Sequence, residues 1–143
     1  MQELTARGAR FSVPNGWQVT RTRTTVSAAP GGQTDTLVSV STFRLLRRYT
    51  PELWGRVVPE LDRAAGQLAR QLAGTLRASR TVTVAGDRAR EYELSFRREG
   101  RDVRERITFA LRDQREYELL CRWRADVAEP VACSALVESF RPV

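Results

Sequence analysis

The chain lacks histidine and lysine entirely, and it has only two cysteines among its 143 residues. Histidine is the commonest general base and a frequent zinc ligand, and lysine supplies the amine of Schiff-base enzymes. A histidine triad is therefore excluded, and two cysteines alone would leave half of a tetrahedral zinc shell unfilled. The sequence also has no phosphate loop, dinucleotide-binding glycine pattern or nucleophile elbow. We therefore expect no enzymatic activity, no metal and no cofactor.

The composition is that of one globular domain with an arginine-rich surface. All 24 basic residues are arginine, and with 17 acidic residues they give a formal net charge of +7. The length suits a single domain, residues 1–143, and no apolar stretch reaches the ~20 residues of a membrane-spanning helix. Residues 1–5 have no apolar core and are not a signal peptide. The protein is cytoplasmic if Met1 is the native start, and secreted or at the cell surface if a leader has been removed.

The first half of the chain predicts short strands followed by a long helix. Residues 10–44 contain β-branched runs separated by turn signals that combine proline and glycine. From Thr50 to Leu76, apolar residues recur every three or four positions, which defines one stripe of an amphipathic helix. Pro59 lies inside this pattern, so we expect a kink there or two consecutive helices.

The second half predicts an antiparallel meander with one buried face and one exposed face. Three segments alternate apolar with charged or polar residues, and turn signals separate them. The alternating segments are residues 92–96, 103–111 and 117–123, and the turns fall at residues 86–87, 99–100 and 112–115. A final helix is expected to begin at Glu129-Pro130 and to bury one apolar face.

The two-residue loop at Glu99-Gly100 predicts the register of the first hairpin. It places Glu93 opposite Arg106 on the exposed face, where the opposite charges support this pairing. The same register turns Glu105 inward, opposite Leu94. Glu105 is thus the one polar residue that breaks the inward apolar pattern of the meander.

Two interpretations of Glu105 stay open. One is a carboxylate with a raised pKa in a pocket, which would be of functional interest. The other is an ion pair with an inward arginine such as Arg90 or Arg98, or a place at the rim of the sheet, because buried carboxylates are usually paired.

The two cysteines predict a covalent link between the last strand and the last helix. Cys121 lies on the inward face of the strand, and Cys133 lies on the inward face of the helix. A helix packed on a strand can bring two such Cα atoms within disulfide range. We favour a disulfide, as in exported proteins, over two buried thiols that act as small hydrophobes. A catalytic thiol is not expected, since it would have no histidine partner.

Clusters of arginine raise the question of an anionic partner. They occur at Arg21/Arg23, Arg47/Arg48, Arg97/Arg98/Arg101 and Arg104/Arg106. Nucleic-acid-binding proteins combine such residues with exposed aromatic rings, but here most aromatic residues fall on inward positions and glutamates interleave the arginines. We expect no nucleic-acid partner, and an anion- or nucleic-acid-binding module stays an alternative.

The motifs at the two ends of the chain resemble those of a known superfamily. Residues 11–17, Phe-Ser-Val-Pro-Asn-Gly-Trp, fit the pattern F-x-x-P-x-G-W, and the chain closes on Ser139-Phe140-Arg141. Strands, a long helix from Thr50 and a turn at Gly86 lie between them. This order is similar to the PsbP-like superfamily, which includes the photosystem extrinsic protein, a Ran-binding import factor and many bacterial secreted proteins and lipoproteins. Cysteines in the last strand and helix look like those of the secreted branch.

The resemblance implies an α+β fold, an α/β/α sandwich with a central antiparallel sheet, one long kinked helix and a C-terminal helix. It implies binding or scaffolding, and no functional residues transfer, because the photosystem and Ran contacts have no equivalents here. We therefore expect a non-enzymatic, exported domain that binds an unidentified protein. The alternative is a small-molecule or lipid carrier with a cleft between sheet and helix, lined by Trp54, Tyr92 or Trp123.

Overall fold

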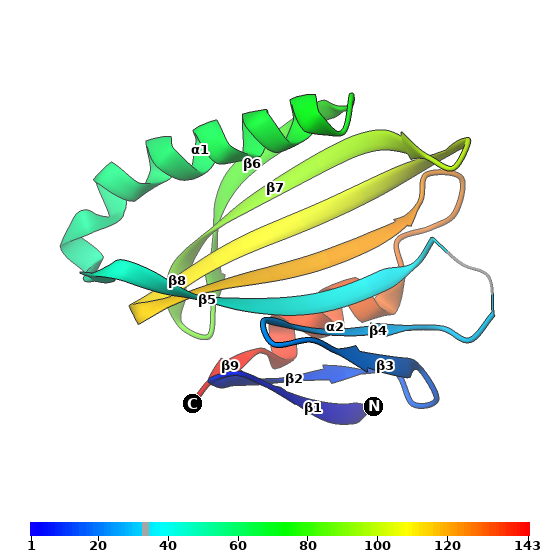
Figure 1. Ribbon diagram of the computed structural model, residues 1–143, viewed down its shortest axis with the longest axis horizontal. Coiled ribbons are helices and arrows are strands. Elements are labelled where there is room, and N and C mark those ends of the chain that lie inside the picture. The colour runs from blue at the N-terminus through cyan, green and yellow to red at the C-terminus, as the bar shows by residue number, and fades with distance from the viewer. Residues whose placement is uncertain (33–34) are drawn as a thin grey trace.

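The computed structural model describes residues 1–32 and 35–143, and it is a mixed α+β fold dominated by antiparallel strands (Figure 1). The elements are β1 (Gln2–Ala6), β2 (Ala9–Val13), β3 (Gln18–Arg21), β4 (Thr25–Ala29), β5 (Leu37–Tyr49), the 3₁₀ turn η1 (Pro51–Leu53), α1 (Trp54–Gln71), β6 (Thr75–Val84), β7 (Asp87–Arg98), β8 (Arg101–Arg124), α2 (Val131–Ser139) and β9 (Arg141–Pro142). A three-stranded sheet has the order β1-β2-β9, and a six-stranded sheet has the order β3-β4-β5-β8-β7-β6. The predicted class and the antiparallel pairing are confirmed.

Strand β8 is a run of 24 extended residues that turns back on itself near its middle (Figure 1). Glu105 in its first half lies 3.9 Å from Arg122 in its second half, whereas a straight strand would separate them by more than ~50 Å. Asp113 has a φ of +53° at the reversal, which confirms the turn predicted at residues 112–115. The first half of β8 then pairs with β7, and the second half pairs with β5.

This reversal decides which face each half of β8 presents. It sets an odd-numbered residue opposite an even-numbered one, as with Glu105 and Arg122. Ile107 and Leu120 therefore share the face that packs toward α1, while Leu119 and Cys121 belong to the opposite core. The prediction of a single buried face for the whole meander is wrong, because the apolar residues of the two halves of β8 point to opposite sides.

Helices cover the large sheet on both sides (Figure 1). α1 lies over β6 and β7, and the core beneath it contains Leu61, Ala65, Ala69, Tyr92, Leu94, Ile107 and Phe109. On the other side α2 and the small sheet enclose a larger core, in which Phe11, Val13, Tyr117, Leu136 and Phe140 are almost fully buried. The register predicted between β7 and β8 is confirmed, with Glu93 opposite Arg106 and Leu94 opposite Glu105.

The long helix ends earlier than its apolar spacing predicts. α1 runs through Pro59 and stops at Gln71, so that Leu76 belongs to β6. Ala73 adopts a φ of +52°, and the N–H of Gly74 donates to the carbonyl oxygen of Ala69 at 2.8 Å, which is a Schellman-type C-cap. This cap turns the chain away from the helix axis and starts β6 at Thr75.

Candidate functional site

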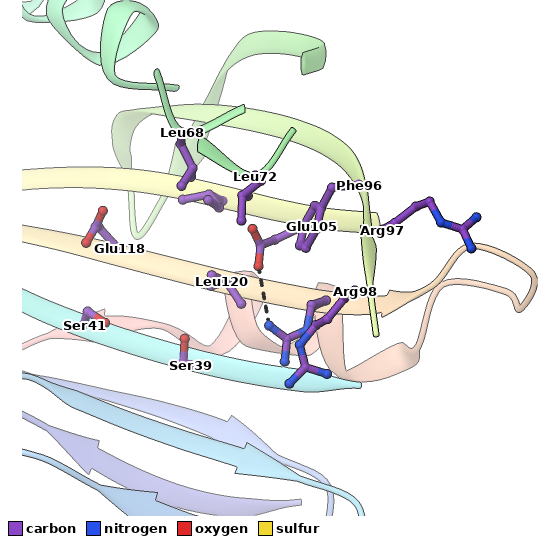
Figure 2. Close-up of a pocket in the computed structure, with 12 residues that line it drawn as sticks. Ser39, Ser41, Leu68, Leu72, Phe96, Arg97, Arg98, Glu105, Glu118 and Leu120 are labelled. Carbon is purple, nitrogen blue, oxygen red and sulfur yellow. Dashed lines mark ion pairs between the residues drawn. The ribbon is translucent and has the colours of Figure 1, made fainter. Parts of the chain in front are cut away.

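A cavity of about 470 Å³ lies between the C-terminal part of α1 and the sheet (Figure 2). Because α1 covers β6 and β7, the adjoining face of β5 and of the second half of β8 is left open. Apolar side chains form one part of the lining, from Leu68, Leu72, Phe96, Ile107 and Leu120. Polar and charged side chains form the rest, from Ser39, Ser41, Arg97, Arg98, Glu105, Glu118 and Arg122.

A second cavity of about 300 Å³ follows along the same side of α1. Val57 and Leu61 of α1 line it, and so does Glu116 of β8. Glu116 lies two positions before Glu118, on the same face of β8, so the two cavities follow one another beside the helix. We refer to these two cavities together as the α1 groove.

Glu105 closes the inner end of the larger cavity. Glu105 is only 5% exposed, and burial raises the pKa of its carboxyl group, although the charge of Arg122 opposes this change. Arg122 lies 3.9 Å away, and burial lowers the pKa of its guanidinium group (Figure 2). Both interpretations of Glu105 therefore hold in part, because it is a pocket carboxylate with a raised pKa and it faces an arginine. The partner is Arg122 and not the predicted Arg90 or Arg98.

At this end of the groove, Arg98 and Arg101 form ion pairs with Asp35, whose side chain is fully buried. Arg98 lies 3.0 Å and Arg101 lies 2.7 Å from its carboxylate, and Arg122 Nε donates to its main-chain carbonyl oxygen at 3.2 Å. The hydrogen bond from Arg101 holds the pKa of Asp35 below its usual value, against the effect of burial. Sequence reasoning missed Asp35, because nothing local in the chain indicates three arginines around it.

Two glutamates lie in the middle of the groove without a cation. Neither Glu116 nor Glu118 makes an ion pair or a hydrogen bond with any residue in the described ranges 1–32 and 35–143. Burial, followed by the negative charge of Glu116, raises the pKa of Glu118 to about 7. Burial also raises the pKa of Glu116. These residues follow an alternating pattern that is typical of an exposed face, so the sequence did not single them out.

Ser39 on β5 faces the same part of the groove. The residue is 6% exposed, and its hydroxyl group has no hydrogen-bond partner among the described residues. Its neighbour Ser41 lies opposite Glu118 in the β5–β8 register, but the hydroxyl of Ser41 is engaged with Thr25 at 2.7 Å. In Figure 2 the oxygen of Ser39 points from β5 toward β8 and the helix.

The three aromatic residues expected to line a cleft lie elsewhere. Trp54 is buried at the start of α1, with the guanidinium of Arg88 5.3 Å from its ring centroid. Tyr92 is buried beneath α1 and donates its hydroxyl proton to Asp62. Trp123 belongs to the core on the α2 side of the sheet. None of the three lines either cavity of the α1 groove.

The face of the sheet that carries Arg106 is covered, contrary to the prediction of an exposed face. The Arg106 side chain is 16% exposed, lies 5.6 Å from the Trp123 ring, and forms ion pairs with Glu93 and Glu129. Glu129 precedes α2, so the segment leading into that helix covers the charges. The ion pair with Glu129 links the segment before α2 to the sheet, although the buried Nε of Arg106 has no hydrogen-bond partner among the described residues.

A disulfide joins Cys121 of β8 to Cys133 of α2, as predicted, with a Cα–Cα distance of 5.4 Å. Both cysteines are almost fully buried. The link fastens α2 to the sheet on the side away from the α1 groove. It is structural, because neither sulfur is free or accessible.

Comparison with known proteins extends only to the fold. No family model matches the chain, and no curated protein does. A solved structure from Bacteroides thetaiotaomicron is similar, with a TM-score of 0.70 and 9% identity, over 95% of this chain and 45% of that chain. This chain therefore spans less than half of that protein's length, and at such identity the likeness carries no function. Neither helix in residues 1–32 and 35–143 combines the length and apolar character needed to cross a membrane.

Proposed function

We propose that this chain is a non-enzymatic protein-binding domain of the PsbP-like α/β/α sandwich type, and that a segment of its partner lies in the α1 groove. The observation that carries the proposal is the groove itself, two cavities beside α1 whose apolar lining is interrupted by Glu116 and Glu118, carboxylates without an ion pair among the described residues. Other charged side chains of the meander form ion pairs, such as Arg97 with Asp102 and Arg106 with Glu93. Unsatisfied groups gathered in one concave place are what a binding surface requires.

The dimensions of the groove favour a chain segment. Residues 116–122 of β8 form its floor, and seven extended residues span roughly 20 Å. An extended peptide of similar length would contact both cavities at once. Partner side chains would pack on Leu68 and Leu120, which are half-buried in the free protein.

The charges argue against an anionic partner at this site. Arg98, Arg101 and Arg122 surround Asp35 or Glu105, so a phosphate would have to displace carboxylates that are already in place. Nucleic-acid binding depends on arginines that are free to neutralise phosphates. The larger cavity presents Glu105 and Glu118, and in the smaller one Arg47, Arg48 and Arg56 share the lining with Glu60 and Glu116.

One observation supports the alternative of a small-molecule carrier. The larger cavity, at about 470 Å³, falls within the range of ~300–1,000 Å³ that is usual for ligand pockets. An amphipathic molecule would fit between the apolar wall and the polar floor.

For the compartment, the buried disulfide supports an exported protein, secreted or at the cell surface, because disulfides persist in oxidising environments.

Selection of peptides from a random displayed library tests the function. The wild-type chain should enrich peptides whose affinity falls at least ~10-fold in the groove variants Leu120→Arg and Leu68→Gln, the loss expected when a central apolar contact is replaced. Ser134→Arg, on the exposed side of α2, is the matched control and should bind normally. Two groove variants are used, on strand and helix, and each is compared with wild type by circular dichroism and thermal melting.

The results separate the alternatives. Peptides that bind all three variants equally would contradict the groove as the site. If the only ligand found is DNA or RNA, with affinity that falls on the order of a thousandfold for a modest rise in salt, protein binding is the wrong function. A small molecule detected by native mass spectrometry in wild type, and lost in Leu120→Arg, would favour the carrier.

A further inference from the structure

The middle of the α1 groove combines three features that together describe a site for a cation. Glu118 and Glu116 carry carboxylates without ion pairs among the described residues, in a chain of net charge +7. Arg47, Arg48 and Arg56 line the smaller cavity together with Glu116, yet no arginine among the described residues forms an ion pair with either carboxylate. A half-buried carboxylate is stabilised in its charged form only when a cation or hydrogen-bond donor joins it.

The second feature is the hydroxyl group of Ser39, which is independent of the acidic pair. The residue is only 6% exposed, its hydroxyl group has no hydrogen-bond partner among the described residues, and it points into the cavity (Figure 2). A hydroxyl oxygen that faces a cavity and makes no hydrogen bond within the protein is available to a group bound there. Its oxygen can accept a hydrogen bond from an N–H group that also donates to Glu118.

The third feature is the apolar path that leads to these groups. Leu68 of α1, Leu72 at the C-cap of that helix and Leu120 of β8 line the cavity beside Glu118. Lysine and arginine side chains have an aliphatic stem and a charged end, and they pack the stem on apolar surfaces. The shape and chemistry of the cavity therefore match such a side chain better than a compact inorganic ion.

We propose that Glu118 and Ser39, supported by Glu116, form a subsite for a lysine or arginine side chain of the partner segment. The inference rests on the proposed function and specifies what its groove recognises. The ammonium or guanidinium group donates hydrogen bonds to the Glu118 carboxylate and the Ser39 hydroxyl oxygen. The aliphatic stem packs between α1 and Leu120. The charges of the bound side chain and of Glu118 then neutralise each other inside the groove.

The first test uses small probes and the full chain. At pH 8, n-hexylammonium and 1-hexanol are titrated separately, and backbone amide resonances are followed by NMR. We expect hexylammonium to shift the resonances of residues 39 and 118 and to bind about tenfold more tightly than hexanol, as one charge-assisted hydrogen bond predicts. Glu118→Gln should abolish that preference, and Ser39→Ala should reduce it severalfold.

Matched controls lie outside the cavity. Glu138→Gln removes an exposed carboxylate on α2, and Ser27→Ala removes a hydroxyl on β4 that does not line the cavity. Both should keep the preference for hexylammonium. Equal binding of the two probes to wild type would overturn the subsite, as would an unchanged preference in Glu118→Gln.

The second test identifies the source of the cation. Peptides selected on the groove are resynthesised with each lysine replaced by norleucine and each arginine by citrulline. Loss of about tenfold in affinity for wild type, but not for Glu118→Gln, supports a partner side chain. Peptides that bind the groove and tolerate both the replacement and Glu118→Gln would overturn the subsite and leave protein binding intact. Glu118-dependent binding of hexylammonium without any groove-binding peptide would contradict protein binding, and it would assign the subsite to small amines.

Discussion

Glu105 and Arg122 face each other across the reversal of β8, with 3.9 Å between Glu105 Oε1 and Arg122 Nη1, and Glu105 is 5% exposed. The pair connects the first and second halves of the longest strand at the inner end of the groove. Because Arg122 also donates to the main-chain oxygen of Asp35, one guanidinium group holds the strand, the loop before β5 and a buried carboxylate together. The stability of this end of the sheet therefore depends on Arg122 more than on the surface arginines.

Replacing Arg122 tests that dependence. Arg122→Met should lower the free energy of unfolding by about 3 kcal/mol at pH 8, because it leaves Glu105 buried without its cation. The double variant Glu105→Gln/Arg122→Met should recover part of this loss. Arg124→Met is the matched control, since it breaks an exposed ion pair with Asp126 and should change stability by less than about 1 kcal/mol. Equal urea midpoints for Arg122→Met and Arg124→Met would contradict the role given to Arg122.

The pH dependence of stability should report Glu118. Its pKa is about 7 in the folded protein and 4.5 ordinarily, so the folded state binds this proton more tightly than the unfolded state. The contribution of Glu118 to the free energy of unfolding is therefore highest below about pH 4.5, and it falls as pH rises to about 7. Glu118→Gln should remove the fall and make the protein more stable than wild type by about 1–3 kcal/mol at pH 8, after allowance for partial exposure.

Urea unfolding between pH 4 and pH 8 measures this difference. Glu138→Gln, on the exposed side of α2, should instead follow the wild-type curve at each pH. Parallel curves for wild type and Glu118→Gln would mean that Glu118 titrates normally. A stabilising substitution at a groove residue is also what a binding site predicts, because functional groups are often retained at the expense of stability.

The sequence predicts the features of this fold that neighbouring residues determine, and it does not predict those that depend on tertiary packing. The β7–β8 register follows from the loop at Glu99-Gly100 and from opposite charges, and the structure matches it residue by residue. The turn near Asp113 was also predicted from the sequence, at residues 112–115. What the alternation could not show is which face of the sheet each half of β8 buries, because that depends on what packs against each face. Cys121 was nonetheless paired correctly with Cys133, since Cys133 lies on the buried face of α2 and Cys121 on the face of the sheet that α2 covers.

The groove was harder to predict than the strands. Glu116 and Glu118 alternate with apolar residues, and this pattern is shared by ordinary exposed strands. Their partial burial arises because α1 stops short of β5, which is a consequence of tertiary packing. Ser39 carries no local signal for the same reason. Of the aromatic residues expected to line the cleft of a carrier, Tyr92 and Trp123 fill the two cores instead.

Alanine substitution at two glycines, Gly74 after the end of α1 and Gly66 within the helix, tests how closely the chain packs at the helix end. A Cβ at Gly74 would lie 2.5 Å from the Ser95 carbonyl oxygen and 2.8 Å from Phe96 Cβ, so Gly74→Ala must displace either β7 or the helix cap. We expect a loss of about 1–3 kcal/mol, as for overpacking at a closely packed site. Gly66→Ala, within α1, meets only an arginine side chain at 3.8 Å and should stabilise by about 0.5–1 kcal/mol. Thermal melting of both variants should therefore give shifts of opposite sign, and two shifts of the same sign would contradict this account of the helix end.

The disulfide predicts a difference between oxidised and reduced protein. The loop from Cys121 to Cys133 is short, at a sequence separation of 12, and its closure should raise the free energy of unfolding by about 2–4 kcal/mol. Urea unfolding with and without reductant measures this directly, and reductant should have no effect on the double variant Cys121→Ala/Cys133→Ala. Because the two cysteines are 2% and 1% exposed, reduction of the folded protein should be slow and should accelerate as denaturant opens the α2 side. Mass spectrometry of unreduced, alkylated protein gives the complementary check, and two alkylated thiols in protein kept under oxidising conditions would show that the link does not form.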